Sequence, residues 1–345
     1  MLRISRLAES VSRHGRGGLA SAVLLLAVVF ASEQPVHALT ISPTFDSAIA
    51  DNPDGALIEG AINTAIGTID SLYGNAVNLP VTFAYRPQAP GTLSLTNQLF
   101  YHVPFSTYVG LLQNASAADP ANAFLATALA NLPSGNAVNA SVMSITGAQL
   151  TMLHAVAGLP GNTPGDATIS LNSNANFAFT GPVPPDRYDA VGDVEHELDE
   201  VLGGGGGGST LNRCITNPGF YCGTYGPTDL YRYSAPGVPG YTASSAATSY
   251  FSIDGGNTAI ASFNQDPAGD LGDFAPPCGT GGGADELIQD AFSCPGPYEA
   301  YTTSSPEYAM VEAIGWDSVA VPEPDTLALL GFSLVGLGFV SRRRD

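Results

Sequence analysis

Apolar residues recur at helical spacing in several parts of the chain. The clearest case is residues 54–73, where apolar positions return every three or four residues and Gly74 follows as a stop signal. Further helices are predicted over residues 105–112, 120–132, 146–158, 189–202 and 306–314, and Asp119 is the expected N-cap of the helix over 120–132. Strands are predicted over residues 81–85, 167–172, 177–179, 250–253 and 259–263, with an Asn/Ser turn between the second and the third. The expected fold class is α+β with a mixed sheet.

The composition changes after the helix predicted over 189–202. Six consecutive glycines, residues 203–208, follow it, and such a run is typical of a mobile, low-complexity segment. Residues 209–305 are then rich in Gly, Ser, Thr, Pro and Tyr. We therefore expect an α+β part over residues 39–208 and a loop-rich, Gly/Tyr-rich C-terminal part over residues 209–318.

The first 38 residues have the order of a secretory signal peptide. Arginines come first, an apolar run from Leu19 to Ala31 follows, and small residues precede the expected cleavage after Ala38. A membrane-spanning anchor is the alternative, but the apolar run is too short for one. We therefore expect residues 1–38 to be removed and the protein to be exported.

Residues 319–345 form a second special segment. A Pro-Glu-Pro triplet at 322–324 is followed by an apolar stretch, Leu327–Val340, and by arginines at 342–344. A helix of that length spans about 21 Å, short of the roughly 30 Å of a bilayer core. The segment resembles the PEP-CTERM sorting signal of Gram-negative bacteria. That resemblance implies an exosortase partner that recognises and removes the tail, membrane contact only through this segment before processing, and a final place in the cell envelope or outside the cell.

The expected mature core is strongly acidic. It has no lysine, and its 26 acidic residues outweigh four arginines, so its net charge is about −22. Such a surface repels nucleic acid and anionic lipid. Nucleic acid is therefore not an expected partner.

All four cysteines lie in this core. An even number in an exported chain predicts two disulfides, which would staple the loop-rich part. Three pairings are possible, and the simplest joins Cys214 to Cys222 and Cys278 to Cys294. A four-cysteine zinc site is the alternative, but no Cys-x-x-Cys pair supports it.

Residues 196–200, His-Glu-Leu-Asp-Glu, carry recognisable chemistry on the helix predicted over 189–202. His196 and Glu200 are four residues apart, so they share a helix face and can close on one metal ion. Glu197 is offset by about 100° and can serve as a general base beside a metal-activated water. Zinc is the expected ion, although the carboxylate in place of the second histidine of the His-Glu-x-x-His pattern also suits manganese or calcium. The alternative is an acidic amphipathic helix that contains one histidine.

A third metal ligand has to come from outside this helix. Asp229 in a downstream loop ranks first, and its alternative role is that of a turn or capping residue paired with Arg232. The other core histidines, His102 and His154, lie among apolar residues and are expected to be core residues instead.

Loop aspartates offer a separate candidate for calcium binding. They occur in Asp254-Gly255-Gly256 and at Asp266, Asp270 and Asp273. The sequence contains no EF-hand, so turn formation by these aspartates is the favoured alternative.

Several segments in one order resemble a family of PEP-CTERM-associated, metalloprotease-like proteins. They are residues 188–191 and 195–203, which hold the His-Glu-x-x-Glu motif, and residues 229–237, 250–256, 263–264, 269–274 and 313–317. The resemblance covers about residues 81–317 and implies a zincin-like fold and proteolysis. The chain departs from the family where glycines replace an arginine expected shortly after Gly203. It departs from the longer zincin pattern where Gly206 stands in place of a third histidine.

Two functions are consistent with these observations. The first, which the sequence favours, is an exported metal-dependent endopeptidase: zinc is held by His196, Glu200 and Asp229, and Glu197 deprotonates the water that attacks a peptide or protein substrate. The second is a non-catalytic envelope or extracellular-matrix protein on a degenerate zincin scaffold. It is suggested by the missing second histidine and the acidic surface. A weaker third hypothesis is a calcium-dependent adhesin.

Overall fold

The computed structural model describes residues 39–132, 142–159, 167–206, 211, 224–241, 244, 246–275 and 286–319. The expected signal peptide and sorting tail lie outside the described residues. So do Cys214, Cys222 and Cys278, so the predicted disulfides stay a prediction. The fourth cysteine, Cys294, is described and is buried.

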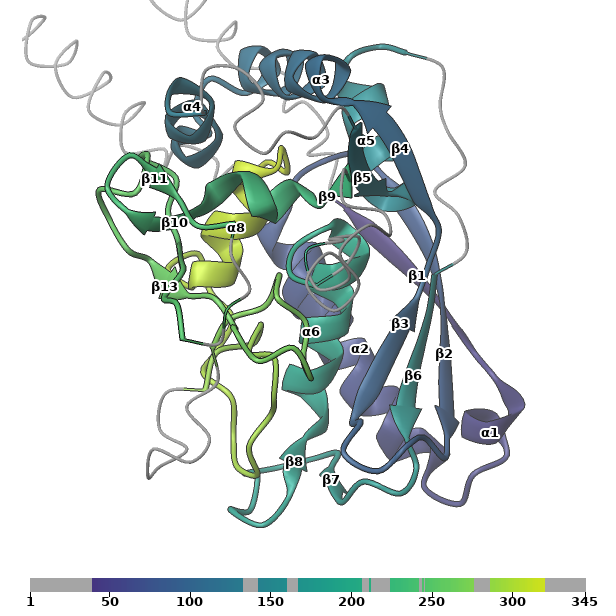
Figure 1. Cartoon of the computed structure of the whole chain (residues 1–345). Coiled ribbons are helices and arrows are strands. Elements are labelled where there is room, and N and C mark those ends of the chain that lie inside the picture. The colour runs from purple at the N-terminus through teal and green to yellow at the C-terminus, as the bar shows by residue number, and fades with distance from the viewer. Residues whose placement is uncertain are drawn as a thin grey trace, which may run out of the picture. The chain divides into compact units, whose positions relative to one another are not determined.

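Helices and several separate sheets make up the described part of the chain, which confirms the α+β class (Figure 1). The helices are α1 (Ser47–Ala50), α2 (Gly55–Leu72), α3 (Phe105–Ala118), α4 (Ala123–Ala130), α5 (Gly147–Val156), α6 (Ala190–Leu202), the 3₁₀ helix η1 (Pro227–Tyr231) and α8 (Pro306–Ala313). The strands are β1 (Thr40–Phe45), β2 (Asn78–Arg86), β3 (Ser94–Asn97), β4 (Phe100–Pro104), β5 (Val142–Thr146), β6 (Ala167–Asn172), β7 (Phe177–Ala178), β8 (Tyr188–Asp189), β9 (Thr224–Tyr225), β10 (Arg232–Ala235), β11 (Val238–Pro239), β12 (Tyr250–Phe251) and β13 (Ala261–Ser262).

The main sheet has the strand order β1-β2-β6-β3. The first three strands are parallel, and β3 runs antiparallel to β6, with Thr96 opposite Ile169. Alternate residues of β2, such as Val81 and Phe83, are buried, as expected for a strand with one face against a core. Helices α2 and α6 pack against each other, and α6 also contacts β6 and β3 (Figure 1). The edge strand β3 therefore lies beside α6.

The periodicity places most helices correctly. The helices predicted over 54–73, 189–202 and 306–314 correspond to α2, α6 and α8 within one or two residues at each end. The N-cap predicted at Asp119 is wrong, because α4 begins later: Asn122 accepts the backbone N–H of Leu125 over 2.8 Å. Strands β6 and β7 follow one another as expected but join different sheets, since β7 pairs in parallel with β8.

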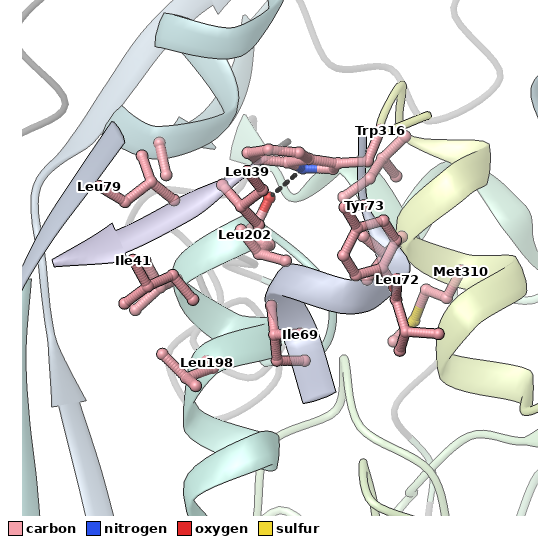
Figure 2. Close-up of a cluster of buried hydrophobic side chains, with 14 of the residues drawn as sticks. Leu39, Ile41, Ile69, Leu72, Tyr73, Leu79, Leu198, Leu202, Met310 and Trp316 are labelled. Carbon is pink, nitrogen blue, oxygen red and sulfur yellow. Dashed lines mark hydrogen bonds between the residues drawn. The ribbon is translucent and has the colours of Figure 1, made fainter. Parts of the chain in front are cut away.

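Buried apolar residues from several parts of the chain pack around the C-terminal end of α6. Trp316 is fully buried there, and its indole Nε1–H donates to the backbone carbonyl of Leu202 over 2.9 Å (Figure 2). The last carbonyls of a helix have no partner within it, so the indole satisfies one of them. Tyr73 lies against Trp316 with ring centroids 6.3 Å apart, and Met310 is part of the same core. This core takes residues from both sides of the boundary predicted at residue 208, which stays a prediction.

A second sheet, with the strand order β11-β10-β12-β13, is formed by residues that follow α6 in the chain. Phe251 of β12 belongs to an aromatic cluster: the ring centroids of Phe251 and Phe263 are 6.2 Å apart, and those of Phe263 and Phe274 are 5.8 Å apart. A third sheet has the order β4-β5-β9. No helix among the described residues combines the length and the apolar character needed to cross a membrane.

The four described glycines of the run after α6 are closely packed, which the prediction of a mobile segment did not anticipate. Gly203 ends α6 in the left-handed conformation with φ of 101°. Gly205 has φ of 75°, and a Cβ atom there would lie 2.1 Å from Gln289 Nε2. Glycine is therefore required at these positions both by the turn and by the close approach of neighbouring chain.

Candidate metal centre

Helix α6 directs its polar face toward a cavity. Asp189 caps the helix by accepting the backbone N–H of Val191 over 3.0 Å. Val194 and Leu198 are fully buried in the core. His196, Glu197 and Glu200 lie on another face and line a cavity of about 770 Å³. The amphipathic sequence of α6 thus sets which of its residues can meet a ligand.

Three side chains converge in this cavity. His196 Nε2 lies 3.9 Å from Glu200 Oε1 and 3.9 Å from Asp273 Oδ2. The ligand atoms of the three residues all lie within 4.8 Å of one another. Zinc binds nitrogen and carboxylate oxygen at about 2.0–2.2 Å, so one ion can contact two atoms that are about 4 Å apart. The sequence predicted two of these residues, and the structure adds Asp273 as the third.

Neighbouring groups orient these side chains. His196 Nδ1 lies 2.8 Å from the backbone carbonyl of Ile288, which can only accept a hydrogen bond, so Nδ1 is the donor and Nε2 is the ring atom that a metal ion can bind once its proton is displaced. Gln289 Nε2 donates to Asp273 Oδ1 over 3.0 Å, which leaves Oδ2 on the side of His196. Partners of this kind are typical of metal ligands, because they fix the tautomer and the direction of the free atom.

The electrostatics of the group also favour a cation. Burial lowers the pKa of His196, but the charges of Asp273 and Glu197 outweigh this effect and raise the pKa to about 9. Burial, together with repulsion from Glu197 and Asp273, raises the pKa of Glu200 well above its ordinary value. Burial likewise raises the pKa of Asp273 to about 7. The metal-free site therefore retains protons, and a divalent cation can replace them.

Glu197 lies beside the three converging residues. It is 4% exposed and lines the cavity. The hydroxyl of Thr96, on the edge strand β3, donates to Glu197 Oε2, and Glu197 is also hydrogen-bonded to Glu200. A carboxylate held in this way next to a metal-binding group can accept a proton from a reacting water.

Close contacts with two aspartates exclude a side chain at positions 205 and 206. A Cβ atom at Gly206 would lie 2.6 Å from the Cβ of Asp270. A Cβ atom at Gly205 would lie 2.7 Å from Asp273 Oδ1. The loop that carries these aspartates thus packs directly against the backbone at positions 205 and 206.

Arg232 and Asn264 hold this loop, residues 264–273, in place. The guanidinium of Arg232 is fully buried, donates to the backbone carbonyls of Asn264 (2.9 Å) and Leu271, and lies 4.3 Å from the centroid of the Phe263 ring. The Asn264 side chain donates to the carbonyls of Asp266 and Asp270, each over 3.0 Å. The backbone N–H of Asn264 donates to the carbonyl of Asp273 over 2.8 Å. The position of Asp273 therefore depends on contacts made by residues distant from α6.

Asp229, the third ligand predicted from the sequence, is not a member of the converging group. It is fully buried, and its Oδ2 accepts the backbone N–H of Gly226 over 2.9 Å at the start of η1. Burial lowers the pKa of Arg232 to about 10, and the negative charges of Asp229 and Asp273 oppose that effect. These contacts correspond to the alternative role of Asp229, a capping residue next to Arg232.

The other candidate ligands also lie elsewhere. The prediction that His102 and His154 are core residues is wrong: His102 is exposed on β4, and His154 is only half-buried on α5. Asp254 accepts hydrogen bonds from Ser252 Oγ and from the backbone and hydroxyl of Thr258, as in a turn. Among the described residues, only His196, Glu200 and Asp273 form a group of three possible metal ligands.

The other residues of this site have only weak signals in the sequence. Asp273 lies in a loop whose aspartates suggest, from the sequence, calcium ligands or turn residues. Gln289 and Thr96 had no local signal at all, because their role depends on long-range packing.

Residues 320–344 match the PEP-CTERM protein-sorting motif. This tail indicates a bacterial protein that is exported, sorted at the cell envelope and recognised by an exosortase, as the sequence predicted. No curated protein and no solved structure matches the chain.

Proposed function

We propose that this protein is an exported, zinc-dependent endopeptidase with a zincin-like fold. The convergence of His196, Glu200 and Asp273 within 4.8 Å at a cavity that Glu197 also lines carries the proposal. One nitrogen and two carboxylate oxygens form a ligand set that zinc accepts. Asp273 replaces Asp229 in the ligand set expected from the sequence.

Each side chain has a distinct role. Bound zinc would polarise the peptide carbonyl and make a coordinated water more acidic. Glu197 would accept a proton from the attacking water and later give it to the leaving amine. Thr96 keeps the Glu197 carboxylate oriented through its hydroxyl hydrogen bond. The Ile288 carbonyl and the Gln289 amide keep His196 and Asp273 in position.

The edge strand β3 supports a peptide substrate. Among the described strands it pairs with β6 alone and ends the main sheet. Its residues Ser94, Leu95 and Thr96 line the same cavity as Glu197. An extended peptide can add to such an edge through backbone hydrogen bonds, which places its carbonyls next to the cavity.

The test compares wild-type protein with Glu197→Gln in a protease assay on unfolded protein substrates. The variant should bind zinc as the wild type does but lose at least 100-fold in cleavage rate, because only the proton acceptor is removed. Glu299→Gln, a change of the same kind at an exposed position, is the control and should cleave normally. Full activity of Glu197→Gln would contradict the mechanism.

One observation favours the alternative of a non-catalytic envelope or matrix protein. Gln289 Nε2 lies 3.4 Å from His196 Nε2 while it also donates to Asp273, so the group has a hydrogen-bonded arrangement of its own without an ion. Folded wild-type protein that takes up no zinc at any tested concentration would support this alternative.

A further inference from the structure

Two members of the candidate metal centre depend on a single turn, which contains residues 288 and 289. His196 donates through Nδ1 to the backbone carbonyl of Ile288 over 2.8 Å. The side-chain amide of Gln289 donates to Asp273 Oδ1 over 3.0 Å. Both turn residues are buried, and neither belongs to a helix or a strand. The turn can keep two metal ligands in place only if its own backbone is held.

Glu307 on α8 supplies that support. Its Oε1 accepts the backbone N–H of Gln289 over 3.1 Å, and the backbone N–H of Ile288 also donates to this carboxylate. The side chain is 1% exposed. A buried backbone N–H without a partner is costly, and an ionised acceptor makes the stronger kind of hydrogen bond. One carboxylate therefore fixes both residues of the turn through their backbone.

The turn is also joined by its backbone to the segment that carries Asp273. The carbonyl of Gln289 accepts the backbone N–H of Phe274 over 2.8 Å, and the carbonyl of Phe274 accepts the N–H of Ala291 over 3.0 Å. Phe274 directly follows Asp273 in the chain. A shift of the turn would therefore displace Asp273 in two ways, through its side-chain hydrogen bond and through the backbone next to it.

Helix α8 gives Glu307 a rigid base. The helix packs against α4 and α6 and contributes Tyr308 and Met310 to the apolar core (Figure 2). The Glu307 carboxylate also accepts its own backbone N–H in the first turn of α8, where a negative charge is favourable. The side chain is thus fixed at one end by a core helix and reaches the metal centre with the other.

Capping of α8 alone does not account for this arrangement. A glutamate in the first turn of a helix can stabilise that helix through the N–H groups of the same turn. Glu307 instead directs Oε1 to a backbone N–H that lies 18 residues earlier in the chain. The charge of His196 also acts on Glu307, so the carboxylate lies within electrostatic range of the candidate metal centre.

We propose that Glu307 is a positioning residue of the metal centre. By binding the N–H groups of Ile288 and Gln289, it keeps the carbonyl that orients His196 and the amide that orients Asp273 in their places at the same time. It acts through the turn and takes no part in proton transfer. The inference rests on the proposed function, because it assumes that the converging residues hold zinc.

The test measures metal binding and does not depend on cleavage. Zinc affinity is determined by chelator competition for the wild type and for Glu307→Gln, each confirmed as folded by circular dichroism. The amide of glutamine has a single acceptor atom, so it cannot serve both N–H groups as the carboxylate does. We expect zinc affinity to fall about tenfold or more, as for other residues that support metal ligands. The absorption spectrum of the cobalt-loaded protein should also change, because it reports the geometry of the ligands.

A second glutamate of the same helix provides the matched control. Glu312 is 3% exposed and is hydrogen-bonded to Tyr308, away from the turn. Glu312→Gln removes a buried carboxylate from α8 in the same way, so it should keep zinc affinity within about twofold and leave the cobalt spectrum unchanged. Glu307→Asp is a further variant, which keeps the charge at the start of α8 but is one methylene too short for the turn. It should lose zinc affinity by about threefold or more.

The proposal is overturned if the Glu307 variants bind zinc within about twofold of the wild type and give its cobalt spectrum, or if Glu312→Gln loses as much affinity as they do. Glu307→Asp decides if Glu307→Gln does not fold. Weaker zinc binding in these variants, together with no cleavage by the wild type, keeps the positioning role and rejects proteolysis. Cleavage by a zinc-loaded wild type, with unchanged zinc binding in the variants, keeps proteolysis and rejects the positioning role. A wild type that binds neither metal rejects both.

Discussion

The most demanding prediction concerns Arg232, which holds the loop that carries Asp273. Substitution by lysine keeps a positive charge near Asp229 but replaces the planar fork, which serves two backbone carbonyls, by a single ammonium. We expect the Arg232→Lys protein to be destabilised and to bind zinc more weakly, because the loop of residues 264–273 loses one of its anchors.

The magnitude follows from the contacts. One charge-assisted hydrogen bond to a buried carbonyl contributes about 1.5–3 kcal/mol. The stacking of the guanidinium at 4.3 Å from the Phe263 centroid adds about 1 kcal/mol or more in a buried setting. Arg232→Lys should therefore lower the free energy of unfolding by about 2–4 kcal/mol. Displacement of Asp273 should lower zinc affinity by about tenfold or more, as for other changes around metal ligands.

The assay combines urea unfolding of the metal-free protein with a chelator competition for zinc. Arg86→Lys is the control, since the Arg86 side chain is 54% exposed and makes a surface ion pair with Asp46 over 3.0 Å. That change should alter stability by less than about 1 kcal/mol and leave zinc affinity unchanged. The reasoning is refuted if Arg232→Lys unfolds as the wild type does, or if it loses stability while its zinc affinity stays the same.

Two other predictions concern stability. Burial raises the pKa of Glu312, a residue 3% exposed, to about 7. The folded protein therefore favours the neutral, protonated form of Glu312. The protein has its full stability below the unfolded-state pKa of about 4.5, and it loses stability as the pH rises through 7, because the buried carboxyl then has to ionise. Glu312→Gln should accordingly raise the unfolding free energy at pH 8 by about 1–3 kcal/mol and not at pH 4, and equal effects at both pH values in urea titrations would contradict this. Trp316→Phe leaves the Leu202 carbonyl at the end of α6 without its indole donor and should cost about 1–3 kcal/mol in urea unfolding followed by circular dichroism, so an unchanged midpoint would show that this hydrogen bond is dispensable.

Much of α6 could be predicted from the sequence, because its signals are local. An acidic N-cap, Asp189, apolar residues at helical spacing and a glycine at 203 define the helix. Once the helix is known, the four-residue spacing places His196 and Glu200 on one face. The family resemblance and the sorting tail added the expected class of site and the export of the protein.

The third residue of the proposed metal site could not be derived in the same way. Asp229 and Asp273 both stand in polar loops after α6, and nothing in their local sequence decides between them. The choice depends on the buried Arg232, which lies close to both aspartates and holds the loop of Asp273 by its backbone carbonyls. Long-range contacts of this kind have no periodic signal.

The packing of the glycine run could not be predicted from the sequence either. A sequence of six glycines predicts a flexible linker, because glycine permits many backbone conformations. In the structure, the side chains of Gln289, Asp270 and Asp273 lie very close to the backbone at positions 205 and 206. A side chain at either position would clash with them, so only glycine fits there. Only the fold shows that these residues leave room for the site.

The zinc content of the purified protein shows whether His196, Glu200 and Asp273 hold a metal ion. It should be determined by mass spectrometry on the wild type, Asp273→Asn and Asp229→Asn, each confirmed as folded by circular dichroism. We predict about one zinc ion per chain in the wild type and in Asp229→Asn, and none in Asp273→Asn, because Asp273 belongs to the converging group and Asp229 does not. A folded wild type without zinc, or a variant Asp273→Asn that retains it, would contradict the account.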